Sequence, residues 1–218
     1  MFLSRIRSFP MEHLGCLFGV GFVFALCVMP RQAPATVLDF DDLPLGYNLT
    51  INGYAGLTWE PGSPDSEGKR SSWVTSSNGT FGYPFSQPRN VFNSGGSAST
   101  AIGIAFPFDV DMTGAYFAAQ GAPSSVWATS ITVRGFREGI EISTSGTLGP
   151  VTTVSQWLDL SAITGVDRIV VESGLGTGGI GSFGMDDLTF TYVPEPAGIS
   201  LGLLGLGGLL LRRRCRGG

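Results

Sequence analysis

Cysteine and histidine are almost absent from this 218-residue chain, and the few that occur lie near its two ends. The cysteines are Cys16, Cys27 and Cys215, and the single histidine is His13. The long middle segment, residues 36–192, therefore contains neither residue type, so no disulfide can cross-link it. It also cannot build a Ser-His-Asp or Cys-His nucleophile, or a zinc site with His or Cys ligands. Carboxylate chemistry and oxygen-ligated metals remain available to it.

Basic side chains are also scarce in residues 36–192. The segment has 15 acidic and 6 basic residues, a net charge of −9, against a formal net charge of −4 for the whole chain. The difference arises because arginines cluster in the terminal segments. Nucleic acid is not an expected partner, since its binding needs Lys and Arg to displace counterions. The 157 residues of this segment fit one domain with a sizeable core.

Residues 1–35 have the pattern of a secretory signal peptide. Two arginines open the segment, an apolar run follows from residue 14 to residue 29, and Ala33 and Ala35 frame an A-x-A cleavage site. The sequence therefore predicts export, with cleavage before Thr36. An uncleaved anchor helix is the alternative.

The last 26 residues contain three different pieces in a fixed order. The first is a stiff motif that breaks any preceding structure, formed by Val193, Pro194, Glu195 and Pro196. Next comes an apolar run, Ala197–Leu211, whose 15 residues would form a helix of roughly 22 Å. It is short for a hydrocarbon core of about 30 Å and has no polar face, which argues against a buried amphipathic helix. The third piece is a cationic cluster expected to stop in the cytoplasm, formed by Arg212, Arg213, Arg214 and Arg216.

This order of pieces resembles the PEP-CTERM sorting tail of Gram-negative bacteria that make extracellular polysaccharide. The resemblance covers residues 193–218 and extends to all three pieces. It implies that an exosortase, a membrane-embedded transpeptidase-like enzyme, recognises Pro194, Glu195 and Pro196 and cuts near them. The chain would then be a substrate of that enzyme, held transiently in the inner membrane by its C-terminal helix. Its expected destination is the cell surface or the extracellular matrix.

Residues 36–192 are rich in glycine and small polar residues, and short runs with β-type alternation are frequent in them. We predict strands at Val37–Phe40, Ala55–Trp59, Ser72–Thr75, Asn90–Phe92, Ala98–Phe106, Gly114–Ala119, Ser130–Phe136, Ile140–Ser143, Val154–Asp159, Asp167–Glu172 and Met185–Tyr192. Short strands at this spacing favour an all-β fold, an antiparallel jelly-roll-type β-sandwich, with a barrel as the alternative.

Acidic residues mark both ends of this segment, with Asp39 and Asp41 near its start and Asp186 and Asp187 near its end. These two stretches resemble the terminal strands of MAM-like and carbohydrate-binding jelly rolls. The resemblance implies that the first and last strands lie near each other and that their carboxylates hold a structural Ca²⁺. Calcium takes 6–8 oxygen ligands, which clustered aspartates can supply. The alternative is that these are solvated charges that protect the ends of a sheet from aggregation.

Aromatic residues are the second class of candidate site residues, because exposed rings stack on sugar faces. We predict that Trp73 and Tyr83 form such a glycan contact. The other candidates are Trp59, Phe85, Trp127 and Trp157. For each of them the alternative is packing in the core, where aromatic residues dominate β-sandwich energetics.

The sequence thus favours an exported, non-enzymatic surface or matrix protein with glycan binding as its candidate activity and exopolysaccharide as a candidate partner. A glycoside hydrolase is an alternative, since such enzymes need only two carboxylates flanking one bond. Its candidate residues are Asp39, Asp41, Glu60, Glu138, Glu141 and Asp186, and the sequence does not show which pair would meet. A purely structural biofilm component is the third hypothesis.

Overall fold

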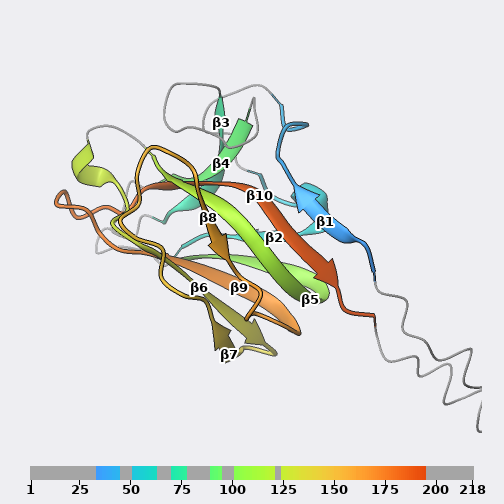
Figure 1. Ribbon diagram of the computed structural model, residues 1–218. Coiled ribbons are helices and arrows are strands. Elements are labelled where there is room, and N and C mark those ends of the chain that lie inside the picture. Colours follow the sequence, from blue (N-terminus) through green and yellow to red (C-terminus); the bar gives the residue numbers. More distant parts are fainter. Residues whose placement is uncertain are drawn as a thin grey trace, which may run out of the picture. The chain divides into compact units, whose positions relative to one another are not determined.

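The computed structural model describes residues 33–44, 51–62, 70–77, 89–94, 101–120 and 124–194. Most of the predicted signal peptide and sorting tail lies outside these residues, as does Tyr83. The described part is all-β, with ten strands and two short 3-10 helices (Figure 1). None of its helices is long and apolar enough to cross a membrane.

The strands pair antiparallel throughout. In chain order they are β1 (Ala35–Leu38), β2 (Thr58–Glu60), β3 (Ser72–Ser77), β4 (Arg89–Ser94), β5 (Ala101–Ala119), β6 (Ile131–Arg137), β7 (Ile140–Thr144), β8 (Gln156–Asp159), β9 (Val166–Ser173) and β10 (Phe183–Tyr192). The 3-10 helices are η2 (Tyr54–Gly56) and η3 (Ser124–Val126).

The strands form the two layers of a sandwich, and β5 belongs to both. The first half of β5 lies between β2 and β9, and β6 and β7 continue this layer beyond β9. The second half of β5 lies between β10 and β8. On its other edge β10 pairs with β4 and then with β1, and β3 lies beyond β4. We call these the β9 sheet and the β10 sheet.

The passage of β5 from one sheet to the other occurs near Pro107. Its pairing with β9 is interrupted between Ala105 and Val110. Proline has no N–H to donate to a ladder, so it is suited to a place where pairing is interrupted. Strands that change sheets through bends make the corners of sandwiches. The sequence predicted two strands here, Ala98–Phe106 and Gly114–Ala119, and the structure joins them into one strand of 19 residues.

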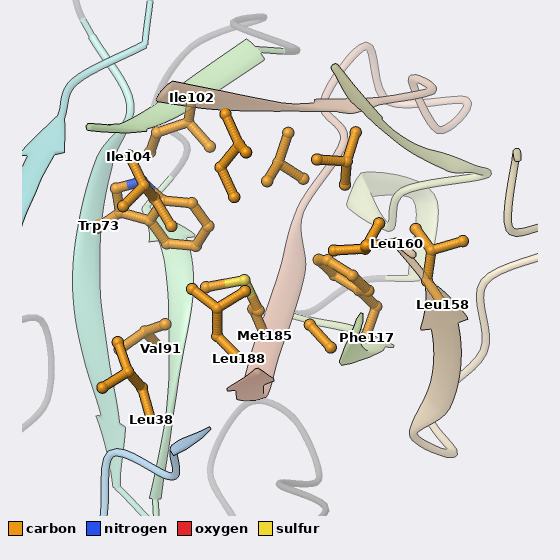
Figure 2. Close-up of a cluster of buried hydrophobic side chains, with 14 of the residues drawn as sticks. Leu38, Trp73, Val91, Ile102, Ile104, Phe117, Leu158, Leu160, Met185 and Leu188 are labelled. Atoms are coloured by element: carbon orange, nitrogen blue, oxygen red, sulfur yellow. The ribbon is translucent and has the colours of Figure 1, made fainter. Parts of the chain in front are cut away.

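Side-chain alternation determines which residues fill the space between the sheets. On β6, Ile131 and Val133 are fully buried while Thr132 and Arg134 lie on the outer face. Figure 2 shows the resulting core, in which Ile102 and Ile104, from the part of β5 in the β9 sheet, lie opposite Leu38, Val91 and Leu188 of the β10 sheet. The expected all-β sandwich is therefore confirmed.

The predicted strand at Ala55–Trp59 is wrong in its first half. Gly53, Ala55 and Gly56 all have positive φ angles, which are incompatible with an extended strand, and they form the turn around η2. Pairing with β5 begins only at Thr58. The strand expected at Val154–Asp159 likewise starts late, at Gln156, because the Val154 N–H bonds the hydroxyl of Thr152 in a turn.

Trp73 is a central residue of the core. It is 1% exposed, its ring packs against Trp59 and Phe183, and its indole N–H donates to the carbonyl of Gly103 at 2.9 Å. Replacing a buried tryptophan by alanine typically costs about 3–5 kcal/mol. We expect Trp73→Ala to lower the free energy of unfolding by about that amount, measured by urea denaturation. The control Val154→Ala, at a residue 70% exposed, should change it by less than about 0.5 kcal/mol. Equal effects of the two substitutions would contradict the core position of Trp73.

Candidate functional site

The two acidic ends of the domain meet, as the resemblance to jelly rolls implied. Strands β1 and β10 are neighbours, and Leu38 pairs with Leu188 at the end of their ladder. The next residues along the two strands are Asp39 and Asp187. The position of this acidic cluster is thus set by the pairing of the first and last strands.

Within the cluster, Asp39, Asp41 and Asp42 have hydrogen-bond partners in the protein itself. The Asp39 carboxylate accepts the N–H of Asp41 at 3.3 Å, in a local turn. Asp41 accepts the backbone N–H of Arg89 on its carboxylate at 3.2 Å and the Arg89 guanidinium on its carbonyl at 3.0 Å. The phenol of Tyr54 donates to Asp42 at 2.6 Å. These contacts fasten the chain after β1 to η2 and β4.

Asp186 and Asp187 differ from Asp39 in their surroundings. Asp186 is 2% exposed and accepts the N–H of Asp187 at 2.9 Å, whereas Asp39 is exposed. Asp187 has a φ of 47°, where the register of β10 against β5 shifts. Among the residues that the structure describes, no three His, Cys, Asp or Glu side chains are grouped so that they could hold a metal ion. Calcium binding by the four aspartates remains a prediction.

The aromatic candidates fall into different environments. Trp59 and Trp73 are buried in the core, so the structure offers no face of Trp73 to a sugar. Trp127 is partly buried and packs against the core. Trp157 is 40% exposed. Tyr83 and Phe85 lie outside the described residues.

Trp157 forms an exposed aromatic platform on the outer face of the β10 sheet. It pairs with Tyr116 across β8 and β5, and the two rings meet edge to face with centroids 5.0 Å apart. The indole also covers Gly114, where any side chain would collide with it. Leu158, the next residue, is buried on the inner face. The ring of Trp157 is therefore held by the sheet beneath it and keeps one surface in solvent.

A carboxylate lies next to this platform. Asp159 is the next outward residue on β8 and pairs with Gly114, the glycine beneath the indole. Hydrogen bonds from the backbone N–H and the side chain of Ser161 lower the pKa of Asp159, so it is ionised at neutral pH. Trp157 was a candidate from the sequence, but its neighbours Tyr116 and Asp159 were not predicted. The alternation of each strand could be read from the sequence, but the pairing of β8 with β5, which brings these residues together, could not.

The outer face of the β9 sheet has a different character, because ion pairs occupy it. Arg168 contacts Glu60 at 2.7 Å and also lies over the ring of Phe136. Arg134 contacts both Glu141 and Glu172, at 2.9 and 2.8 Å. Two of the carboxylates considered for a hydrolase, Glu60 and Glu141, are thus each bonded to an arginine. A third, Glu138, lies in the turn between β6 and β7.

Comparison with known proteins gives similarity of fold. No family model matches the sequence, and no curated protein matches it. Among solved structures, the K2 cleaved adhesin domain of Lys-gingipain aligns with 72% of this chain and 99% of its own, at 12% identity and a TM-score of 0.47. The carbohydrate-binding module CBM51 from Clostridium perfringens GH95, in complex with methyl-galactose, aligns with 72% and 100%, at 11% identity and a TM-score of 0.31. An F5/8 type C domain from Bacteroides fragilis aligns with 69% and 100%, at 11% identity and a TM-score of 0.35.

The contact between Tyr54 and the acidic cluster predicts a pH effect on stability. Burial, the hydrogen bond to Asp42 and the charges of Asp42, Asp39 and Asp41 raise the pKa of the Tyr54 phenol. A raised folded-state pKa gives a stability contribution that is complete below the unfolded-state pKa of about 10 and is lost as pH rises above it. We expect the urea concentration at the midpoint of unfolding to fall as pH rises from about 9 to about 11. This fall should be steeper for the natural chain than for Tyr54→Phe. Parallel curves would show that the contact contributes nothing in solution.

Proposed function

We propose that this chain is an exported, non-enzymatic surface or extracellular-matrix protein whose β-sandwich binds a glycan. The observation that carries the glycan part is the platform of Trp157 on the outer face of the β10 sheet. It combines a fixed, half-exposed indole with the ionised carboxylate of Asp159 beside it. The C–H face of a sugar ring can stack on the indole while its hydroxyls donate to the carboxylate.

The charge of the protein favours a neutral glycan. Residues 36–192 have a net charge of −9, which disfavours acidic polymers. The platform also lies at the edge of its sheet, since β8 pairs with β5 alone among the described strands. An edge position suits a long polymer, which can pass over the indole and continue beyond the protein on both sides.

Two alternatives have less support from the described residues. A glycoside hydrolase needs two carboxylates facing one bond, and Glu60 and Glu141 are instead paired with arginines. A purely structural matrix component would not need an exposed, supported tryptophan. The indole of Trp157 forms a continuous aromatic surface with the ring of Tyr116, and an exposed aromatic patch is more informative than a single exposed side chain, so we favour a ligand here.

The glycan proposal predicts the effect of removing the indole. Trp157→Ala should weaken binding to a neutral polysaccharide by at least about tenfold, the loss expected when an aromatic hot spot worth about 2 kcal/mol is truncated. Binding of the full chain in mild detergent to a polysaccharide panel would be measured by calorimetry. The control is Leu175→Ala, which removes a side chain of similar exposure, 44%, elsewhere on the surface. Undiminished binding by Trp157→Ala would rule out this platform.

The export part of the proposal rests on the terminal segments of the sequence. The proposed pathway is translocation across the inner membrane, anchoring by Ala197–Leu211, and processing near Pro194, Glu195 and Pro196 by an exosortase. Strand β10 supports this arrangement, because it ends at Tyr192 and leaves the motif directly after the folded domain. Strand β1 begins beside it, with Ala35 paired to Thr191 (Figure 1). Both terminal segments therefore leave the domain at one edge.

Two variants separate anchoring from processing. Deleting residues 193–218 should release the protein from membranes or leave it mislocalised. Glu195→Ala should keep the apolar anchor, abolish cutting and leave the protein in the inner membrane. Fractionation and immunoblotting in an exosortase-containing Gram-negative host would measure both. Unchanged localisation of the truncated chain would contradict the assignment of the tail.

A further inference from the structure

A second exposed aromatic group lies at the end of the sandwich where β10 terminates. Phe108, in the corner of β5, is 57% exposed. Its ring meets that of Tyr192 edge to face, with centroids 6.1 Å apart. Tyr192 in turn packs on Phe190, and Phe190 on Phe106 in the core. This line of rings fixes Phe108 in a solvent-facing position, so we call Phe108 and Tyr192 the aromatic end.

The aromatic end is fastened to the start of the sorting motif. The N–H of Val193 donates to the carbonyl of Asp109, the residue after Phe108, at 2.9 Å. Pro194 follows at once and is exposed. The apolar run begins at Ala197, three residues later. Three residues span at most about 10 Å, even when fully extended.

The short link between Pro194 and Ala197 limits how far the folded domain can be from the bilayer in an anchored chain. The headgroup region of one leaflet is about 5–8 Å thick, half the difference between the full bilayer and its hydrocarbon core. A helix that starts at Ala197 inside the bilayer therefore holds Pro194 at the level of the headgroups or just outside them. The aromatic end, joined to Val193, must then come against the membrane surface.

We propose that the aromatic end is a membrane-contact surface, with Phe108 and Tyr192 inserted at the boundary between lipid headgroups and acyl chains. This inference rests on the anchoring in the proposed function and adds the orientation of the domain. Aromatic residues are favoured at this depth because a ring can be buried while a polar tip, such as the Tyr192 hydroxyl, stays hydrated.

Apolar contact, and not charge, must drive this docking. Arg137 is paired at 2.8 Å with Asp109, the residue after Phe108, so its positive charge is already compensated. With a net charge of −9 for residues 36–192, the domain gains little from anionic lipids. Docking on the bilayer is therefore expected to persist with neutral lipids and at high salt.

The same orientation places the glycan platform away from the lipid. Tyr116, which supports Trp157, is eight residues along β5 from Phe108. At about 3.3 Å per residue, the two aromatic groups are roughly 26 Å apart along the strand. An anchored domain would therefore contact the bilayer with one end and present Trp157 near the other.

A spin label beside Phe108 tests the proposal in the full chain. The background variant has its three cysteines, Cys16, Cys27 and Cys215, replaced by serine. A nitroxide is attached at Pro107→Cys, which is exposed and leaves Phe108 intact. The chain is reconstituted in vesicles of neutral phosphatidylcholine, and collision with oxygen and with a water-soluble nickel complex reports the depth of the label. We expect headgroup depth at residue 107, and a shift toward water when Phe108→Ser is added.

The control label is placed at Val154→Cys, which is 70% exposed and lies close to Gln156, the partner of Phe117 at the far end of β5. It should remain in water. Vesicle flotation distinguishes a failure of the anchoring from a failure of the membrane contact. A chain that does not float contradicts the anchoring and with it this inference. A chain that floats but keeps the residue 107 label in water overturns the membrane contact alone. A label buried only when exosortase is present in the vesicles would mean that the surface binds that enzyme and not lipid.

Discussion

The rest of the structure depends on one strand that belongs to both sheets. Each half of β5 is hydrogen-bonded on both edges, and the strand forms the centre of the β9 sheet and then of the β10 sheet. The interruption of the β5–β9 ladder between Ala105 and Val110 makes this change possible, because it lets the chain pass from one layer into the other. Buried backbone N–H and C=O groups need hydrogen-bond partners. Both edges of β5 must therefore be covered by other strands, and the sheets are built around it.

The two sheets turn different chemistry to solvent. On the β9 sheet, three arginine–carboxylate contacts cover the outer face, formed by Arg168 with Glu60 and by Arg134 with Glu141 and Glu172. On the β10 sheet, the absence of a side chain at Gly114 lets the indole of Trp157 lie against the backbone. On the β9 sheet these arginines and glutamates are already bonded to one another. The β10 sheet presents an aromatic surface that a ligand can cover.

The length of β5 also separates two aromatic groups that serve different partners in our proposals. Trp157 lies beside its C-terminal half and Phe108 at its corner, next to the point where the chain leaves the domain. The proximity of β1 to the end of β10 brings both termini of the domain to one edge.

Much of this molecule was predictable from local patterns. The alternation in β6 and β10 indicated their inner faces, and the lack of His and Cys in residues 36–192 excluded whole classes of site, because these properties belong to the chain itself. Local patterns could not distinguish Trp73 from Trp157, since each lies in a short strand beside an aliphatic residue, Val74 or Leu158. In the structure both faces of β3 are covered, so Trp73 and Val74 are both buried, whereas only the Leu158 face of β8 is covered and Trp157 stays exposed. The tertiary structure likewise joined the two strands predicted around Pro107 into β5 and brought β1 beside β10, because strand pairing is a contact between segments far apart in sequence.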